Sequence, residues 1–262
     1  EKLSFEESIR RAGDAIHRFP LVNVQGVPLM RPIAENWKSI WEFCPDPSDL
    51  LISTYPKAGL DLLKQMNPPR VIKTHLPIQL VPEGFWKNKC KVIYVARNAK
   101  DNLVSYFHFD RMNLTQPEPG PWEGYIQKFM KAQLAWGSWY DHVKGYWKEK
   151  EEKNILYLLF EDMKENPSRE IKKIMHYMDL SVSDEVIEKI VQLTSFHIMK
   201  DNPMANYSYI PKPVFDQSIS SFMRKGEVGD WENHFTAAQA QMFDENYAEQ
   251  MSDVDIPFRD NI

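Results

Sequence analysis

The chain has 262 residues, of which 43% are hydrophobic and 26% are charged, and its formal net charge is -5. Such a chain can bury a sizeable core, and one domain over residues 1–262 fits its length at least as well as two small ones. The slightly negative balance excludes a global basic field that would attract nucleic acid or anionic lipid, so any anion site must be local.

Cysteine usage and hydropathy indicate the compartment in which the protein works. Cys44 and Cys90 are too few for a disulfide framework and do not have the spacing of metal ligands. No apolar run approaches membrane-spanning length, and residues 1–11 are charged where a signal peptide would be apolar. We therefore expect a cytoplasmic protein that binds neither nucleic acid nor a membrane and needs no metal.

Short apolar runs alternate with longer helical patterns along the chain. Runs rich in aliphatic and aromatic residues predict buried strands at 50–54, 91–96 and 155–160. Helical spacing predicts helices over 101–112, 122–147, 167–178, 183–193 and 237–251. This alternation indicates an α/β fold with a central, mainly parallel sheet flanked by helices. Ligands bind beyond the carboxyl ends of such strands, so the residues after each strand are the first candidates for a site.

The first predicted strand runs into Thr54-Tyr55-Pro56-Lys57-Ala58-Gly59. Such a turn can aim backbone N–H groups and one ammonium group at an anion. It is not a Walker A loop, because it lacks the leading glycine and has no Ser or Thr after Lys57 to hold magnesium. Alone, this pattern is more typical of an ordinary structural turn.

A histidine follows the short apolar stretch that comes next. His75 lies after Ile72-Lys73-Thr74, at a strand end where an imidazole can point into a cleft. A single histidine is more often structural than catalytic, so this position needs further support.

Two more cationic sites follow. Arg97 comes directly after the strand at 91–96, and Ser105 lies on the helix that follows, so both can grip one phosphate group. Near the carboxyl end, Phe222-Met223-Arg224-Lys225-Gly226 joins two cations to a glycine. Each site taken alone can also be a solvated basic loop.

Five motifs in order give the sequence a family resemblance. From about Val24 to the C-terminus the chain resembles the cytosolic sulfotransferases, specifically their phenol-type branch, with a P-loop-like mononucleotide-binding topology. The motifs are Tyr55-Pro56-Lys57-Ala58-Gly59, Lys73-Thr74-His75-Leu76-Pro77, Ala96-Arg97-Asn98-Ala99-Lys100-Asp101, Phe160-Glu161-Asp162-Met163-Lys164-Glu165-Asn166-Pro167 and Arg224-Lys225-Gly226-Glu227-Val228-Gly229-Asp230-Trp231.

The resemblance implies a donor, 3'-phosphoadenosine 5'-phosphosulfate, and a product, 3',5'-adenosine bisphosphate. It implies that the 5'-phosphosulfate is held by Lys57, Ala58 and Gly59. It assigns the 3'-phosphate to Arg97, Ser105, Arg224, Lys225 and Gly226. It assigns the adenine and its pocket to Phe160, Thr194, Phe196, Phe222 and Met223. The family usually has tyrosine at the position of Phe160, so one hydroxyl contact to the base is expected to be missing here.

The resemblance also implies the chemistry. His75 is expected to act as general base, Lys57 to stabilise the departing phosphate oxygen, Lys73 to steady the sulfuryl oxygens, and Ser105 to restrain Lys57. The acceptor is expected to be a small apolar molecule such as a phenol, a steroid or an amine. The positions implied for it are Ile33, Pro56, Lys73, His75, Phe109, Tyr207 and Phe215.

The sequence departs from the family at two places. After Gly59 the family continues through Thr-Thr-Trp into a long helix, whereas Leu60 follows here at once and a few dozen residues have no counterpart. Either the molecule truly lacks this segment, or the folded enzyme contains a segment that this sequence omits. Because its loss would remove a core helix behind the sheet, we expect the second. In the usual dimer segment, Glu232, Ala237 and Gln241 replace Lys, Val and Glu, so we expect a monomer or a weak homodimer.

Two other functions remain open at this point. A P-loop kinase or NTPase would use Lys57 on its phosphates, but the sequence has no Walker A loop and no convincing acidic magnesium site at a strand end. A nucleotide-binding protein that has lost turnover fits the break after Gly59, although both Lys57 and His75 are present.

Overall fold

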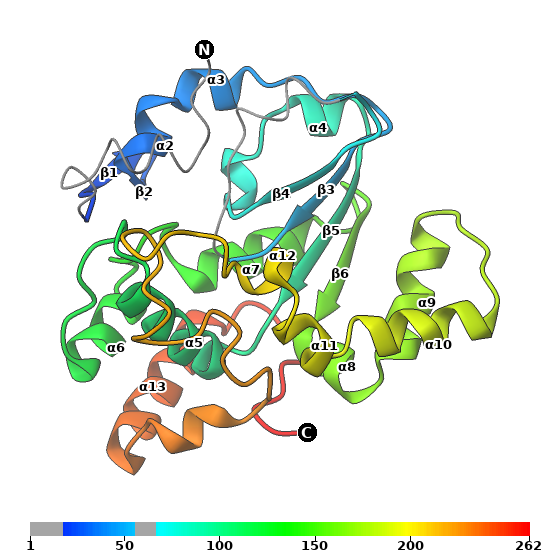
Figure 1. The fold of residues 1–262 in the computed structure, drawn as a ribbon. Coiled ribbons are helices and arrows are strands. Elements are labelled where there is room, and N and C mark those ends of the chain that lie inside the picture. The colour runs from blue at the N-terminus through cyan, green and yellow to red at the C-terminus, as the bar shows by residue number, and fades with distance from the viewer. Residues whose placement is uncertain (1–17, 56–66) are drawn as a thin grey trace.

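The central sheet of the computed structural model, which describes residues 18–55 and 67–262, is fully parallel. Its strands are β3 (Leu50–Ser53), β4 (Val71–Thr74), β5 (Lys91–Ala96) and β6 (Ile155–Leu159), in the spatial order β4-β3-β5-β6 (Figure 1). The three predicted strands are confirmed, and β4 carries the residues that lead to His75. The predicted α/β class with a mainly parallel sheet is therefore correct.

The strand order creates a switch point. The chain leaves β3 toward β4 on one side and later enters β5 on the other side of β3, so the connections diverge at the carboxyl ends of β3 and β5. A crevice forms at such a point because the crossing segments leave in opposite directions. Leu51, Ile72 and Val92 are in register on one face of the sheet and are almost completely buried.

Helices cover the sheet and its ends. On the side of β6, α8 (Phe160–Glu165), α9 (Pro167–Tyr177) and α10 (Asp184–Leu193) project outward, while α5, α6 and α13 gather on the other side (Figure 1). The bounds of these three are α5 (Ala99–Met112), α6 (Trp122–Met130) and α13 (Ala237–Gln250). Four of the five predicted helices, those near 101–112, 167–178, 183–193 and 237–251, are confirmed within a few residues.

Several short elements were not predicted from the sequence. An antiparallel hairpin is formed by β1 (Leu21–Val24) and β2 (Val27–Met30). The remaining short elements are α2 (Arg31–Glu35), α3 (Trp37–Trp41), η3 (Ile78–Leu80), α4 (Gly84–Lys87), α11 (Phe196–Lys200), α12 (Pro203–Asn206) and η4 (Asp230–Asn233). Among the described helices, none is long and apolar enough to cross a membrane.

The prediction of one helix over 122–147 is wrong. The segment divides into α6 and α7 (Trp139–Glu149), because Ala132, Trp136 and Gly137 between them adopt left-handed backbone angles with φ of 56°, 73° and 81°. Long-range hydrogen bonds hold this break in place: the Trp136 N–H donates to the Pro28 carbonyl at 2.8 Å, and the Tyr55 hydroxyl donates to the Gly137 carbonyl at 2.8 Å. The break places Trp136 against the ring of His75, with ring centroids 5.6 Å apart.

Candidate active site

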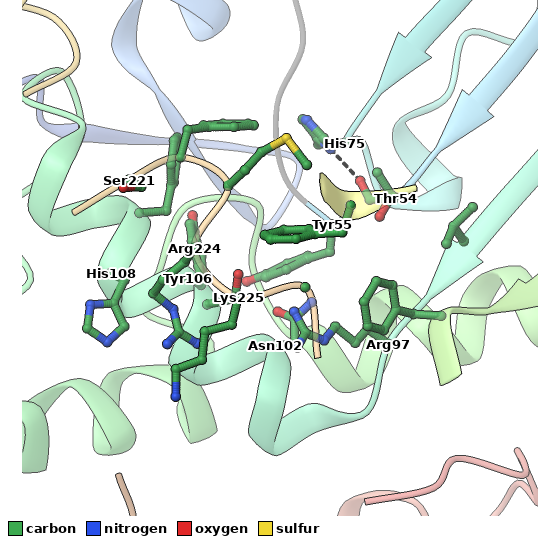
Figure 2. A pocket seen from close by; sticks show the side chains of 18 of the residues that line it. Thr54, Tyr55, His75, Arg97, Asn102, Tyr106, His108, Ser221, Arg224 and Lys225 are labelled. Atoms are coloured by element: carbon green, nitrogen blue, oxygen red, sulfur yellow. Dashed lines mark hydrogen bonds between the residues drawn. The ribbon is translucent and has the colours of Figure 1, made fainter. Parts of the chain in front are cut away.

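A cavity of about 370 Å³ opens at the carboxyl edge of the sheet, next to the switch point (Figure 2). It is lined by residues that follow β3, β4 and β5, by one face of α5 and by the segment 221–226. Most of the predicted site residues line it: Lys73, His75, Arg97, Ser105, Phe109, Phe160, Phe196, Phe222, Met223, Arg224, Lys225 and Gly226. The sheet therefore brings together side chains that are far apart in the sequence.

Other predicted residues lie elsewhere. Pro56, Lys57, Ala58 and Gly59 lie outside the described residues. The other four that do not line the cavity are Ile33, Thr194, Tyr207 and Phe215. Ile33 is partly buried against the core, and Thr194 is exposed at the end of α10, where its hydroxyl donates to the Ile190 carbonyl at 2.8 Å.

Tyr207 and Phe215 form a second layer behind the cavity wall. The Tyr207 ring lies edge-on to Phe222 with centroids 4.5 Å apart, and Phe215 lies edge-on to Phe109 at 5.7 Å. Phe222 and Phe109 line the cavity themselves. Tyr207 and Phe215 thus support the apolar wall from behind.

Sequence reasoning missed part of the lining. The additional residues are Thr54, Tyr55, Val95, Ala96, Asn102, Tyr106, His108, Met112 and Ser221. Four of them lie on α5, and together with Ser105 and Phe109 they recur at helical spacing on one side of it. The position of Ser105 on a predicted helix was the signal that could have found Asn102, Tyr106 and Met112.

The local structure of β4 and β3 fixes the tautomer of His75. Its side chain is completely buried, and its Nδ1 lies 2.5 Å from the Thr54 carbonyl oxygen (Figure 2). Because a carbonyl oxygen only accepts, Nδ1 carries the proton and donates it, so Nε2 is the basic nitrogen of the neutral ring. His75 therefore has the tautomer that a general base needs.

Two side chains of α7 hold the backbone around His75. The His142 Nε2–H donates to the His75 carbonyl at 3.0 Å, and the Tyr146 hydroxyl donates to the Leu76 carbonyl at 2.8 Å. The Tyr94 hydroxyl donates to His142 Nδ1 at 2.7 Å, which fixes the His142 tautomer. Burial lowers the pKa of His142 to about 4, so this ring is neutral at physiological pH.

Arg97 is one of the cations that line the cavity. Its guanidinium lies over the Phe160 ring at 4.5 Å, its Nη2 donates to the Glu227 carbonyl at 2.7 Å, and the Asp101 carboxylate lies 3.6 Å away. Desolvation by burial lowers the pKa of Arg97 from its usual value, with Asp101 opposing that shift. Within residues 18–55 and 67–262, the buried Nε of Arg97 has no hydrogen-bond partner, so it still has a donor to offer to an anionic ligand.

Asp230 holds the other two cations. The Arg224 Nη2 lies 2.6 Å from one of its carboxylate oxygens, and Lys225 Nζ pairs with the other. Burial opposes ionisation of this carboxyl, but hydrogen bonds from Lys225, Asn233 and Arg224 lower the pKa of Asp230 to about 2. Arg224 and Lys225 are therefore oriented around one buried carboxylate.

The first turn of α5 anchors the loop that carries Asp230. The buried Asp101 carboxylate accepts hydrogen bonds from the Gly229 N–H at 2.8 Å and the Trp231 N–H at 3.1 Å. The Asn98 side chain caps α5 by accepting from the Asp101 N–H at 2.8 Å. The helix start and the distant segment 224–231 thus form one hydrogen-bonded unit.

Phe196 and Gly226 are in close contact beside this unit. Gly226 has φ of 66°, and a Cβ built on it would lie 2.2 Å from the Phe196 ring. No residue with a side chain could stand there without displacing that ring. The Phe160 and Phe196 rings both line the cavity, as flat surfaces suited to stacking on a base.

Lys73 lies in β4, two residues before His75. It is an exposed residue that lines the cavity. Desolvation by the surrounding wall nevertheless lowers the pKa of Lys73 from its usual value. In the part of the chain that the structure describes, no group of three or more His, Cys, Asp or Glu side chains could hold a metal ion.

The parallel sheet carries cations and aromatic rings at its carboxyl edge, next to a histidine whose Nε2 is the basic nitrogen. This combination is typical of a transferase that uses a nucleotide. A sulfotransferase domain family matches residues 14–255. Sulfotransferase 1B1 of dog (Canis lupus familiaris) is 44% identical over 282 aligned positions, covering 91% of this chain and 95% of the relative. Human sulfotransferase 1C2 is 45% identical over 280 positions, with the same coverage of 91% and 95%.

Solved structures agree. Mouse sulfotransferase SULT7A1 complexed with PAP has a TM-score of 0.77 at 30% identity, covering 90% of this chain and 96% of that one. Retinol dehydratase, in a complex with retinol and PAP, has a TM-score of 0.81 at 19% identity, covers 99% of this chain and 98% of that one, and shares the fold. The chain belongs to the sulfotransferase family, and it is an enzyme that uses 3'-phosphoadenosine 5'-phosphosulfate as donor.

The alignments also bear on the break after Gly59. The one with the dog protein runs over 282 positions, more than the 262 residues of this chain, so the relative has residues without a counterpart here.

Proposed function

We propose that this enzyme transfers the sulfuryl group to a hydroxyl or amine of a small apolar acceptor, such as a phenol, with His75 as the general base. The observation that carries the proposal is the hydrogen bond from His75 Nδ1 to the Thr54 carbonyl, which leaves Nε2 basic in a cavity that also holds the cations. An acceptor hydroxyl beside Nε2 gives up its proton as its oxygen attacks sulfur. No metal is required for this step in the proposal, because the cations of the chain bind the anionic donor.

The cations fit a donor with two separate phosphate groups. Arg97, Arg224 and Lys225, with Ser105 and the Gly226 backbone, form the proposed 3'-phosphate site. The buried Nε of Arg97 supports this, since burying a donor without a partner is costly unless a ligand supplies one. Phe160 and Phe196, with Met223 and Phe222, form the proposed adenine pocket, and Thr194 remains a proposed contact on its rim.

The 5'-phosphosulfate is proposed to lie at the other end, toward His75. Lys57, Ala58 and Gly59 are proposed to bind it, with Lys57 on the departing oxygen and Ser105 restraining Lys57. Lys73 is proposed to neutralise the sulfuryl oxygens, where developing charge is stabilised by fixed cations.

The acceptor site is proposed to be the apolar end of the cavity. Tyr106, Phe109 and Met112 line it, with Phe222 proposed at its border with the adenine pocket. The second-layer rings of Tyr207 and Phe215 pack behind Phe222 and Phe109. Ile33 and Pro56 remain proposed acceptor contacts. An apolar wall next to a base favours a phenol over a sugar, because it excludes water and leaves polar hydroxyls without partners.

Donor recognition is tested by removing the 3'-phosphate. The nucleotide without it is expected to bind at least a hundredfold more weakly, because several charge-assisted hydrogen bonds worth about 1.5–3 kcal/mol each are lost. Calorimetry should show that Arg224→Ala strongly weakens the binding of 3',5'-adenosine bisphosphate. The same variant should change the affinity for the nucleotide without the 3'-phosphate only a little. Arg169→Ala, on the distant α9, is the matched control and should change neither affinity. Equal affinity of the wild type for both nucleotides contradicts the assignment.

The chain is proposed to act as one domain over residues 1–262, in the cytoplasm, as a monomer or a weak homodimer. Both thiols are free, which agrees with a reducing compartment. The three altered positions of the usual dimer segment, Glu232, Ala237 and Gln241, are exposed on η4 and α13.

We expect sedimentation at micromolar concentration to give the mass of a single chain. Restoring the family pattern with Glu232→Lys, Ala237→Val and Gln241→Glu together is expected to increase the dimer fraction, because a two-fold axis doubles each repaired contact. A wild-type dimer mass that does not change on dilution would show that another surface pairs the chains.

A further inference from the structure

His108 lies in the cavity but has no part in the roles described so far. It stands on α5 about one turn after Ser105, so both side chains are on the same side of that helix. Figure 2 shows it on the side of the pocket where Arg224 and Lys225 lie, away from Arg97. It is thus within the cationic part of the nucleotide site.

A chain of hydrogen bonds defines the protonation of His108. His234 Nδ1 lies 3.0 Å from the Asp230 carbonyl oxygen, so this nitrogen carries a proton and donates it. His234 Nε2 of the neutral ring is therefore an acceptor. His108 Nε2 lies 3.0 Å from it and must donate its own proton. In the neutral pair the remaining nitrogen, His108 Nδ1, then has a lone pair and no proton.

Of the ring nitrogens of His108 and His234, His108 Nδ1 is the one that none of these hydrogen bonds uses, so it can bind a ligand. Across residues 18–55 and 67–262, no side chain or backbone group makes a hydrogen bond with it, and it is not among the fully buried polar atoms that lack a partner. It therefore faces the cavity or solvent. A lone pair beside a phosphate oxygen is repulsive, whereas a protonated Nδ1 donates a charge-assisted hydrogen bond.

Burial and, after it, the charged surroundings keep the His108 ring neutral before a ligand arrives. The groups that face His108 are Arg224 from the 221–226 segment, His234 and Asp230 from η4 and its end, and Arg111 from α5 itself. Burial, together with Arg224, His234 and Arg111, lowers the pKa of His108 to about 4, while Asp230 acts weakly in the opposite direction. An anion placed among these cations reverses the balance, because it favours the charged imidazole.

We propose that His108 is a further phosphate-binding residue, which takes up one proton from solvent at Nδ1 when the nucleotide binds while His234 holds its Nε2. The proposal rests on the proposed nucleotide site. His234 acts as a positioning residue, since it touches His108 and not the cavity. Asp230 links the two parts of the site, because its carboxylate holds Arg224 and its carbonyl holds His234.

Protonation of His108 makes the nucleotide affinity depend on pH. The bound nucleotide raises the pKa of His108 above its free value of about 4, so the complex holds more protons than the free enzyme at any pH between the free and bound values. Binding then becomes tighter as the pH falls from the bound value toward the free value of about 4. If the anion restores the ordinary imidazole value of about 6.5, uptake at pH 6.5 is about half a proton.

Calorimetry of 3',5'-adenosine bisphosphate in buffers of different ionisation enthalpy measures this uptake. Nucleotide phosphates also change protonation near this pH, so the tested quantity is the difference between the wild type and His108→Gln. We expect the wild type to take up about half a proton more at pH 6.5. His176→Gln, on α9, is the control and should behave like the wild type. Binding with no difference between wild type and His108→Gln overturns the proposal, whereas no binding by the wild type overturns the nucleotide site itself.

A second variant separates this role from a structural one. In His234→Phe the His108 ring loses its acceptor and can turn to the tautomer with a proton on Nδ1, which donates to phosphate without uptake. We expect this variant to keep binding with a several-fold lower affinity, and to lose the extra proton uptake. Proton uptake that persists in full at wild-type affinity would show that His234 does not set the tautomer.

Discussion

Replacing His75 by Ala is expected to lower kcat about a hundredfold or more while the affinity for 3',5'-adenosine bisphosphate changes little. The proposed general base is lost, whereas the cations proposed to bind the 3'-phosphate, Arg97, Arg224 and Lys225, are unchanged. Single-turnover kinetics with a phenol acceptor, next to calorimetry of the nucleotide, measures both quantities.

Because His75 is buried, replacing it by Ala is also expected to destabilise the fold. A variant whose side chain is closer in shape to histidine separates this effect from the loss of the base. In His75→Asn the side-chain amide can still donate to the Thr54 carbonyl, as Nδ1 does, but it has no basic nitrogen. We expect His75→Asn to melt nearer the wild type than His75→Ala and to be equally slow in turnover. Turnover within threefold of the wild type in either variant would remove His75 as the base.

Gly226→Ala is expected to have the second large effect, a loss of nucleotide affinity of tenfold or more. The new Cβ would lie 2.2 Å from the Phe196 ring, so the ring must leave its place in the proposed adenine pocket. The left-handed backbone adds about 1–2 kcal/mol of strain for any residue with a side chain.

A second glycine separates these two causes. Gly26 in the β1–β2 turn also has a left-handed backbone, with φ of 87°, but a Cβ there meets nothing within 4 Å. Gly26→Ala should therefore lower thermal stability by a similar amount and leave nucleotide binding unchanged. Nucleotide affinity equal in Gly226→Ala and Gly26→Ala would mean that Phe196 does not contact the base.

The sequence predicted the site best where reactive or charged residues directly follow a strand. Arg97 and His75 each follow a short apolar run. Because a parallel sheet brings the ends of its strands to one edge, local patterns were enough to predict that both residues line one site. Gly226 also stood out as a glycine next to two cations. The structure adds the reason for it, which is the Phe196 ring.

The rest depended on contacts between distant segments. The break between α6 and α7 is held by bonds from Trp136 to Pro28 and from Tyr55 to Gly137, and no local pattern in 122–147 reports either bond. The same holds for the His108–His234 pair, whose members are 126 positions apart. Tyr207 and Phe215 were predicted in the acceptor site and lie one layer behind its wall, because Phe222 and Phe109 stand in front of them.

Transfer of radiolabelled sulfur from 3'-phosphoadenosine 5'-phosphosulfate to a small panel of phenols, steroids and amines tests the central claim most directly. We predict that at least one phenol is labelled without any added divalent metal, and that His75→Asn abolishes the labelling while the nucleotide still binds. Nucleotide binding by the wild type with no labelled acceptor would contradict the account and favour a binding protein without turnover, and a strict requirement for magnesium would contradict the metal-free mechanism.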